Sequence, residues 1–368
     1  MSDADYNWRN LTPAEISRLS VLGRRMFLNE KIGFEQHRNF TIHLWNYDKF
    51  AWELGPRFFK IGSPIKFDPF ESCSVSNCRV TTKNKDIMDA DAVLFHLHLI
   101  AGPPAEVRRA PGQLWVWFGD ESPYNVLIST NDRNLIHYSG FFNWSMTYRM
   151  DSNVPVPYGR AVPLPKDQYL DEIEDYHKLK KKNIALMGWN CGGLNGRYKY
   201  LAEMQKYIEI DVYGRCGTLK CEGHYYENCN KLDDYKFYLA FESLNCDEYV
   251  TEKAWWNALN KSAVPVVMGA PKHSYQKLLP PNSFIHIDDF KGPEELTQYI
   301  KYLLDHPAEY NKYHDWRKRY RVFNEHGYSG APTRQLCRLC EALNYNNKTN
   351  QRADLENYFD HKRQCHDT

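Results

Sequence analysis

The chain of 368 residues has no run of about 18 or more apolar residues, the length that a helix needs to span a membrane. Its first residues, MSDADYNWRN, lack the basic-then-apolar pattern of a signal peptide, which taken alone predicts a cytosolic protein. The formal net charge is only +1, so we expect no nucleic-acid partner, because binding to phosphates requires a basic surface. Internal repeats and low-complexity tracts are also absent. What remains is a globular chain of about two domains.

Cysteines and glycosylation sequons argue against a cytosolic location. The chain has 10 cysteines, and they fall in local groups, which is typical of disulfides or zinc sites. N-x-S/T sequons, the acceptor sequences for N-glycans, occur as well. Together these features favour a domain of the secretory pathway whose membrane anchor is absent from this chain. The candidate glycosylation sites are Asn10, Asn39, Asn143, Asn260 and Asn347.

Apolar segments of strand length occur along the chain, and in its second half they alternate with helical segments. This alternation predicts an α/β fold with parallel sheets wound on both faces. Prolines and a charged segment at 164–182, which resembles a linker helix, separate the halves. We expect domains at 1–165 and 183–336, a linker at 166–182 and a C-terminal segment at 337–368. The expected strands lie within 40–47, 91–99, 113–125, 141–149, 183–189, 210–214, 235–242, 263–269 and 283–288, and the expected helices within 195–208, 249–260 and 292–306.

The stretch FYLAFESLNCDEYVTEKAWWNALN gathers charged residues where a strand turns into a helix. Glu242 ends the strand, and Tyr249, Glu252 and Lys253 fall in the first helical turn. A lysine and free N–H groups suit a phosphate, whereas ionised carboxylates accept hydrogen bonds from sugar hydroxyls. A sugar nucleotide offers both kinds of group. The alternative is that the acidic residues only cap the helix dipole, and spacing does not decide between the two.

A second glycine-rich stretch, NCGGLNGRYKY, also joins a strand to a helix. Its spacing matches neither the dinucleotide-binding motif nor the phosphate loop. Arg197 opens the helix, and its planar guanidinium could pair with a diphosphate. The alternative is an ordinary glycine-rich loop followed by a surface arginine.

The aromatic segment WVWFGDESP offers a candidate general base. Glu121 follows a strand rich in aromatic side chains, whose partial desolvation of the carboxyl group would favour proton acceptance. Asp120 is the competing candidate, and either residue could simply belong to a turn. His96 and His98 alternate in LFHLH and are expected to share one face of a strand. They could line a cleft, be satisfied core histidines or bind metal, but no third ligand stands at a suitable spacing, so we predict no metal site.

The cysteines form two sets. The first set could make a four-cysteine zinc site or two disulfides, and the sequons and the aromatic-rich composition favour disulfides. The second is a local set within the second domain. The first set is Cys73, Cys78, Cys337 and Cys340, and the second is Cys216, Cys221, Cys229 and Cys246.

Several blocks resemble one known family. YKFYLAFES, CDEYVTEKAWWNAL, AVPVVMGAP and SFIHIDDF, preceded in the same order by WVWFGDESP and FNWSMTYRMDSNVPVPYG, are similar to the GDP-fucose-dependent α1,3-fucosyltransferases, glycosyltransferase family 10. The resemblance covers roughly residues 40–340. It implies a GT-B fold, two doubly wound Rossmann-like domains facing across a cleft. It also implies inverting transfer of L-fucose from GDP-β-L-fucose to the 3-hydroxyl of GlcNAc, with no required cofactor and at most stimulation by a divalent metal.

The resemblance assigns roles to matching residues. Glu121 matches the general base, and Arg197 matches the arginine that grips the diphosphate. Lys253 would neutralise phosphate, while Tyr249 and Glu252 complete the donor site. Glu242 matches an acidic residue near the fucose. The family's disulfides would join Cys73 and Cys78 to Cys337 and Cys340, and so tie the segment 337–368 to the first domain. One position departs from the family, because Ser243 stands where asparagine is usual.

Acceptor choice is the finest expectation. DVYGRCGTLKC, NCGGLNGR and the Asn-Cys before the YVTEK helix are most similar to the branch that fucosylates the chitobiose core of N-glycans. The alternatives are a Lewis-type enzyme acting on N-acetyllactosamine antennae and, from another class, an inactive glycan-binding homologue with Ser243 as its lesion. The expected partners are GDP-fucose and an N-glycan or glycoprotein acceptor. The expected location is the Golgi lumen, as the soluble catalytic part of a type II membrane protein.

Overall fold

The computed structural model describes residues 8–33, 38–47, 68–126, 130, 132–222, 227–327, 332–346 and 355–366. The chain divides into two compact units. Unit 1 comprises Met1–Asn10, Tyr158–Pro332 and His366–Thr368, and unit 2 comprises Leu11–Pro157 and Thr333–Cys365. The sequence predicts that residues 158–165 belong to the first domain. The structure assigns them to unit 1, because β7 (Gly159–Pro163) pairs antiparallel with β13 (Tyr320–Asn324).

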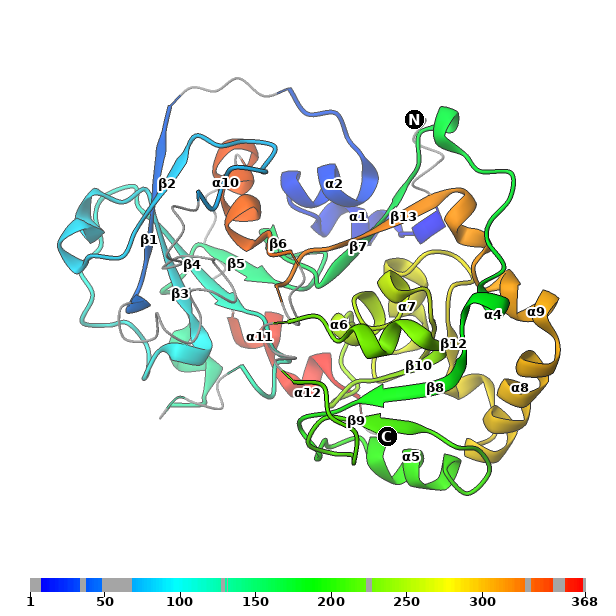
Figure 1. Cartoon of the computed structure of the whole chain (residues 1–368). Helices are drawn as coiled ribbons and strands as arrows, with labels where there is room; N and C mark the ends of the chain where they lie inside the picture. Colours follow the sequence, from blue (N-terminus) through cyan, green and yellow to red (C-terminus); the bar gives the residue numbers. More distant parts are fainter. Residues whose placement is uncertain are drawn as a thin grey trace. The chain divides into compact units, whose positions relative to one another are not determined.

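Unit 1 contains a sheet of five parallel strands in the order β12-β11-β10-β8-β9. Numbered along the chain, this is the order 2-1-3-4-5 of a doubly wound fold, and it reverses between β8 and β10. In Figure 1, α5 and α8 lie on one side of this sheet and α6 and α7 on the other. The strands are β8 (Lys182–Met187), β9 (Asp211–Tyr213), β10 (Tyr235–Phe241), β11 (Val264–Met268) and β12 (Ile285–His286), and the helices are α4 (Tyr176–Leu179), α5 (Arg197–Met204), α6 (Glu252–Trp255), α7 (Lys272–Leu278), α8 (Pro293–Asp305) and α9 (Pro307–Lys312).

The central strand of unit 1 explains why this sequence folds as a parallel sheet. All seven residues of β10 are buried, as expected for a strand covered on both faces. Phe237, Leu239 and Phe241 pack in one cluster with Leu296 and Ile300 of α8, and each is at most 2% exposed. Burial of each such side chain contributes about 1.5–3 kcal/mol. The core therefore holds the carboxyl ends of the strands in fixed positions.

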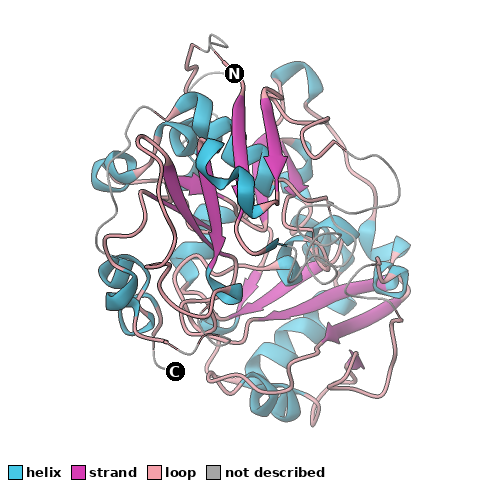
Figure 2. Cartoon of the chain, turned by 90° about the vertical axis from the view of Figure 1, so that its left-hand side faces the viewer, coloured by secondary structure: helices cyan, strands magenta, loops and turns pink. Residues whose placement is uncertain are grey.

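Unit 2 contains six parallel strands in the order β2-β1-β3-β4-β5-β6, the same topology with one strand added. Helix α10 packs against α2 and β6, and the Phe359 ring of α11 lies 5.1 Å from the Trp117 ring of β4. Figure 2 shows helices beside the strands of each sheet, which confirms the predicted α/β class. The strands are β1 (Phe40–Leu44), β2 (Cys78–Thr81), β3 (Ala92–His96), β4 (Leu114–Gly119), β5 (Trp144–Thr147) and β6 (Val154–Pro155), and the helices are α1 (Pro13–Arg18), α2 (Val21–Leu28), α10 (Gln335–Tyr345), α11 (Leu355–Phe359) and α12 (His361–Gln364).

Two expected helices are much shorter than the sequence predicts. The segment 164–182 contains only a 3-10 turn, η6, and α4, because it has little apolar surface that a helix could bury. The segment 249–260 contains α6 and η8, because the N–H of Asn257 bonds to the carbonyl of Glu252, five residues back, and ends the regular α-helical ladder. Within the described ranges, no helix has the length and hydrophobicity needed to cross a membrane. The 3-10 helices are η3 (Asn84–Asp89), η4 (Leu97–Leu99), η5 (Leu135–Tyr138), η6 (Lys166–Gln168), η7 (Asn230–Asp234), η8 (Leu259–Lys261), η9 (Ile287–Asp289) and η10 (Asp315–Lys318).

All the cysteines are disulfide-bonded, which excludes the zinc alternative. In unit 2, Cys73–Cys337 and Cys78–Cys340 attach α10 to the segment that contains β2. In unit 1, the pairs are Cys191–Cys216 and Cys221–Cys229. The expected local set is therefore wrong in part, since Cys216 pairs with Cys191, which lies outside that set. Cys246 and Cys365 are bonded too.

Candidate functional site

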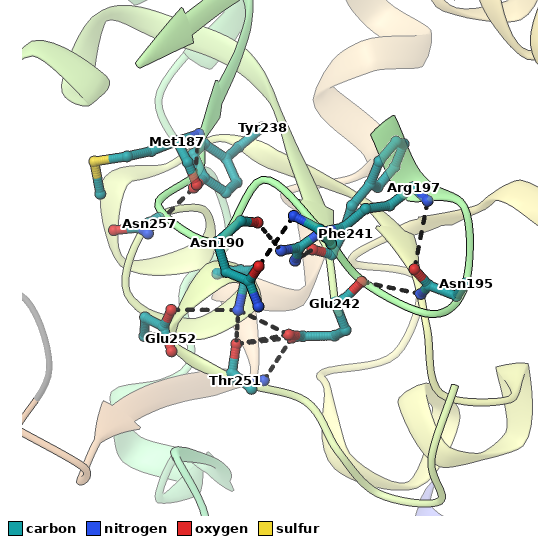
Figure 3. A network of polar contacts seen from close by, with 12 residues as sticks. Met187, Asn190, Asn195, Arg197, Tyr238, Phe241, Glu242, Thr251, Glu252 and Asn257 are labelled. Atoms are coloured by element: carbon teal, nitrogen blue, oxygen red, sulfur yellow. Dashed lines mark hydrogen bonds and ion pairs between the residues drawn. The ribbon is translucent and has the colours of Figure 1, made fainter. Parts of the chain in front are cut away.

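The reversal of strand order in unit 1 marks the place where a doubly wound sheet binds its ligands. Two loops leave the carboxyl ends of the adjacent strands there, 188–196 after β8 and 242–251 after β10. Four of the residues that the sequence analysis chose for the donor meet around these loops: Arg197, Glu242, Glu252 and Lys253. Figure 3 shows the polar cluster around Glu242, with Arg197 and Glu252 beside it.

Glu242 is the centre of this polar cluster. It follows β10, its residue is 0% exposed, and its two oxygens accept four hydrogen bonds. Oε1 accepts from the backbone N–H of Thr251 at 2.8 Å, and Oε2 accepts from Lys253 Nζ at 2.9 Å. The Thr251 hydroxyl bridges both oxygens at 2.9 Å. Gly269 permits this burial, because at its φ of +138° an added Cβ would lie 2.6 Å from the Glu242 Cβ.

Lys253 lies between two carboxylates. Its Nζ is 2.9 Å from Glu242, 3.4 Å from Glu252 and 2.7 Å from the Thr251 hydroxyl, and its side chain keeps 19% exposure. Burial raises the pKa of Glu242, and the charge of Lys253 offsets that rise only in part. Burial by itself would lower the pKa of Lys253, but Glu242 and Glu252 raise it above its ordinary value. The amine is thus held as a cation at a partly open position.

Glu252 is the more accessible carboxylate of the cluster, with its side chain 22% exposed. Burial by itself would raise the pKa of Glu252, but the charge of Lys253 and the local hydrogen bonds lower it overall. It is therefore ionised near neutral pH. An ionised carboxylate at this depth can accept hydrogen bonds from ligand hydroxyls.

In this structure Arg197 donates hydrogen bonds to the protein's own backbone. It is 6% exposed, and its guanidinium donates to the carbonyls of Gly192 at 3.1 Å, Phe241 at 3.0 Å and Asn190. These bonds tie the glycine-rich loop to the end of β10. The diphosphate contact suggested by the family resemblance stays a prediction, while the positive charge of Arg197 is already in the cluster, where it acts on Lys253.

Asn195 and Thr251 are site residues that the sequence analysis missed. Asn195 is 5% exposed, and its Nδ2 donates to the carbonyl of Glu242 at 3.0 Å and to Asn245 Oδ1 at 2.9 Å. The motif N-G-R at the start of a helix was the available signal for Asn195. Ser243, the departure from the family, accepts the N–H of Leu194 through its backbone carbonyl at 3.1 Å, a contact that any residue type provides.

The remaining residues of the quoted stretch lie around the cluster. Tyr249 is 3% exposed, and its ring stands edge-on to Tyr158 at 6.4 Å. Asp247 pairs with His366, with Oδ1 and Nε2 2.9 Å apart. A cavity of about 710 Å³ opens beside the Asn195–Asn245 amide pair, at the carboxyl edge of the sheet, and its size suits a small-molecule ligand.

In unit 2, the structure separates the two candidate bases. Asp120 is 3% exposed, and its Oδ1 lies 2.8 Å from His96 Nε2. The His96 ring in turn stacks on Phe118 at 4.7 Å. Glu121, the next residue, is only partly buried at the end of β4. Asp120 is therefore buried and paired with His96, while the role of Glu121 as general base stays a prediction.

The expectation that His96 and His98 share a strand face is wrong. Strand β3 ends at His96, and His98 lies in the 3-10 helix η4. The backbone turns there, yet the two rings remain neighbours, with centroids 6.2 Å apart. Across the described part of the chain, no group of three or more His, Cys, Asp or Glu residues is arranged to hold a metal ion.

The sequons differ in exposure. Asn10, Asn39 and Asn260 are exposed, whereas Asn143 is 8% exposed and its Oδ1 accepts the backbone N–H of Trp115 at 2.8 Å. Asn347 lies outside the described residues. Exposure therefore favours the first three as sites that can carry a glycan on the folded chain.

The chain is similar to known proteins of one family. The model of the glycosyltransferase family 10 (fucosyltransferase) C-terminal region matches residues 177–358, and the fucosyltransferase N-terminal model matches residues 37–159. Glycoprotein 3-alpha-L-fucosyltransferase A of Drosophila melanogaster is 36% identical over 309 residues, which is 82% of this chain and 56% of that protein. The 4-galactosyl-N-acetylglucosaminide 3-alpha-L-fucosyltransferase FUT6 of Pan troglodytes is 37% identical over 250 residues, 67% of each protein.

A solved structure has the same fold. The crystal structure of an alpha1,3-fucosyltransferase with GDP-fucose matches at a TM-score of 0.50 and 17% identity, covering 89% of this chain and 98% of that one. At this identity the likeness concerns the fold alone. It confirms the predicted GT-B class, with two Rossmann-like units. The chain spans little more than half of the Drosophila relative and two thirds of the Pan troglodytes relative.

Proposed function

Because the chain belongs to glycosyltransferase family 10 (fucosyltransferase), we propose that it transfers L-fucose from GDP-β-L-fucose to the 3-hydroxyl of a GlcNAc residue in N-glycans, with inversion. The observation that carries this proposal is the position of Lys253. The amine is held as a cation between Glu242 and Glu252, where the strand order of unit 1 reverses. A cation beside ionised carboxylates suits a ligand that has both phosphates and hydroxyls.

Unit 1 would bind the donor and stabilise the leaving group. As the bond between the fucose anomeric carbon and the phosphate oxygen breaks, negative charge accumulates on the diphosphate of GDP. Lys253 and Arg197 supply positive charge there, already in place before the reaction and therefore without a reorganisation cost. Glu252 would orient the donor by accepting hydrogen bonds from its hydroxyls, and Tyr249 would orient it by packing against it. The buried Glu242 fixes Lys253 and would lie near the fucose.

Glu121 would act on the acceptor as the general base. It takes the proton from the attacking 3-hydroxyl while that oxygen bonds to the anomeric carbon and GDP leaves. One base is sufficient for inversion, because a diphosphate leaves without strong protonation. The difference in burial supports this choice, since Asp120 is 3% exposed and Glu121 is only partly buried. His96 and His98 are candidates for the acceptor side.

The chitobiose core is the favoured acceptor. The Drosophila relative is named a glycoprotein 3-alpha-L-fucosyltransferase, and the match to it covers more of this chain than the match to the Pan troglodytes relative. The disulfide Cys191–Cys216 joins two of the segments that resemble the core-acting branch, and Cys221, which bonds to Cys229, ends one of them. Such an enzyme would work in the Golgi lumen. The second candidate, fucosylation of N-acetyllactosamine, rests on the name of the Pan troglodytes relative, a 4-galactosyl-N-acetylglucosaminide 3-alpha-L-fucosyltransferase.

An acceptor panel tests the proposal. Transfer of labelled fucose from GDP-fucose is measured with a core chitobiose N-glycan and with an N-acetyllactosamine oligosaccharide. We expect turnover on the core acceptor and much less on the lactosamine. A preference for lactosamine would establish the Lewis-type alternative. Glycan binding without turnover on either acceptor would establish an inactive glycan-binding homologue.

A further inference from the structure

We propose that Asn195 is a positioning residue of the donor site, which joins the two loops of unit 1 so that Lys253 meets the donor in the correct orientation. This inference rests on the proposed function for its substrate, but the geometry behind it is independent of the reaction. Asn195 sits in the glycine-rich loop after β8, and it contacts the turn after β10.

The first step is the contact between the loops. Nδ2 of Asn195 carries two N–H donors, and both are used, one on the carbonyl of Glu242 and one on Asn245 Oδ1. Oδ1 of the same side chain accepts the backbone N–H of Arg197 at 3.4 Å. Asn195 is 5% exposed, and its bond to the carbonyl of Glu242 is buried. This one side chain therefore bonds to three groups, which are the carbonyl of Glu242, Oδ1 of Asn245 and the N–H of Arg197.

The second step leads from Asn195 to Lys253 through one residue. Asn195 holds the backbone carbonyl of Glu242, and the carboxylate of Glu242 holds Lys253 Nζ and Thr251. A displaced Glu242 backbone would move the carboxylate and with it the ammonium group. Asn195 itself makes none of these contacts with Lys253, so its effect on a donor is indirect.

The third step is the close packing of the glycine-rich loop on the same turn. The N–H of Leu194 donates to the carbonyl of Ser243 at 3.1 Å. Gly193 has a φ of +135°, and an added Cβ would lie 3.1 Å from the Ser243 carbonyl oxygen. Only a glycine fits this approach without strain. The amide of Asn195 and the backbone carbonyl of Ser243 thus hold the turn together, and neither contact needs an asparagine side chain at position 243.

The test compares three variants of the full chain. Asn195→Ala removes the amide, and Asn195→Asp keeps its volume but places an acceptor oxygen against the carbonyl of Glu242 and against Asn245 Oδ1. Asn324→Ala is the matched control, because Asn324, at the end of β13 and 9% exposed, also makes a part-buried amide–amide bond in unit 1, from its Nδ2 to Asn260 Oδ1 of η8 at 3.3 Å. Each variant is titrated with GDP by calorimetry, its folding is checked by circular dichroism, and its kinetics are measured with GDP-fucose.

We expect both Asn195 variants to bind GDP roughly tenfold more weakly and to raise the KM for GDP-fucose, with the acceptor KM unchanged. Asn324→Ala should keep the wild-type GDP affinity. Equal GDP affinity in wild type and both Asn195 variants would overturn the positioning role, and so would loss of folding in both of them while Asn324→Ala folds. A wild-type chain that binds no GDP would instead contradict the proposed function, so the two failures are distinguishable.

Discussion

Lys253 Nζ lies 2.9 Å from Glu242 Oε2, and the Glu242 side chain is only 1% exposed. A buried ion pair of this kind contributes little net stability compared with apolar residues, but removal of one partner is costly because the other charge stays buried. The ion pair therefore couples the stability of unit 1 to Lys253, the cation that we propose binds the donor.

Lys253→Met should destabilise the protein by about 3–5 kcal/mol at neutral pH, because it leaves the Glu242 carboxylate buried without its cation. Burial already raises the pKa of Glu242, and loss of Lys253 would raise it further. The folded variant then binds more protons than its unfolded chain above the ordinary pKa of 4.5, so its stability should fall as the pH rises from there. Urea unfolding at several pH values measures this.

The double variant Glu242→Gln/Lys253→Met is the control for that prediction. It removes both charges and should recover part of the lost stability, with little dependence on pH in the acidic range. Equal unfolding free energies for wild type and Lys253→Met would show that the pair is not a buried ionic contact.

Glu121→Gln should lower kcat by about 10²–10⁴-fold, the usual contribution of a general base, while the affinity for GDP stays unchanged. The substitution keeps the size of the side chain and removes its ability to accept the proton. Steady-state kinetics with GDP-fucose and calorimetry with GDP measure the two effects. Asp120→Asn is the comparison: if it stops turnover while Glu121→Gln remains near wild type, the base is Asp120.

The two disulfides of unit 2 should be redundant. They close loops of 264 and 262 residues between nearly the same segments. Either disulfide alone therefore keeps most of the loop-closure entropy that the two together remove from the unfolded chain. Replacement of Cys73 and Cys337 by serine opens a loop of only about eight residues and should cost about 2.5 kcal/mol, whereas removal of both pairs should cost about 8 kcal/mol. Thermal unfolding of the single-pair and double-pair variants checks this. Additive losses from the two pairs would refute the redundancy.

The lowered pKa of Lys180 predicts that the free energy of unfolding rises with pH. Its amine is buried between the carbonyls of Asp233 and Lys261, and burial, assisted by the charges of Arg317 and Lys261, lowers its pKa from 10.5 to about 8. Between those values the unfolded chain binds more protons than the folded one, so stability should increase from pH 8 to pH 10.5. Lys180→Gln should remove this rise, and the exposed Lys178→Gln should retain it. Parallel curves for wild type and Lys180→Gln would contradict the assignment.

The sequence predicts much of the fold because the local signals are strong. The apolar run that became β10 and the Gly-Pro start of α8 place these elements within a few residues of their observed positions. Strand β2 was missed, because its four residues, CRVT, carry little hydrophobic pattern and their pairing with β1 is long-range. The strand order 2-1-3-4-5 is likewise a property of distant contacts, which periodicity does not encode.

Part of the candidate site could likewise be predicted from the sequence, and part of it could not. Glu242 and Lys253 could be placed together from the sequence, because a strand end and the helix that follows it are neighbours in the chain. The three carbonyls around Arg197 could not, since they belong to backbone positions that folding brings together and any residue type could provide them. The amide of Asn195 was missed for the same reason: its partners lie in another loop.

Calorimetric titration of GDP into wild type and Lys253→Met, at a pH where both are folded, tests the central claim most directly. The assignment of this cluster to the donor predicts that wild type binds GDP and that the variant binds it at least about tenfold more weakly, because charge-assisted hydrogen bonds to phosphate contribute about 1.5–3 kcal/mol. Unchanged GDP affinity in a folded Lys253→Met variant would contradict it.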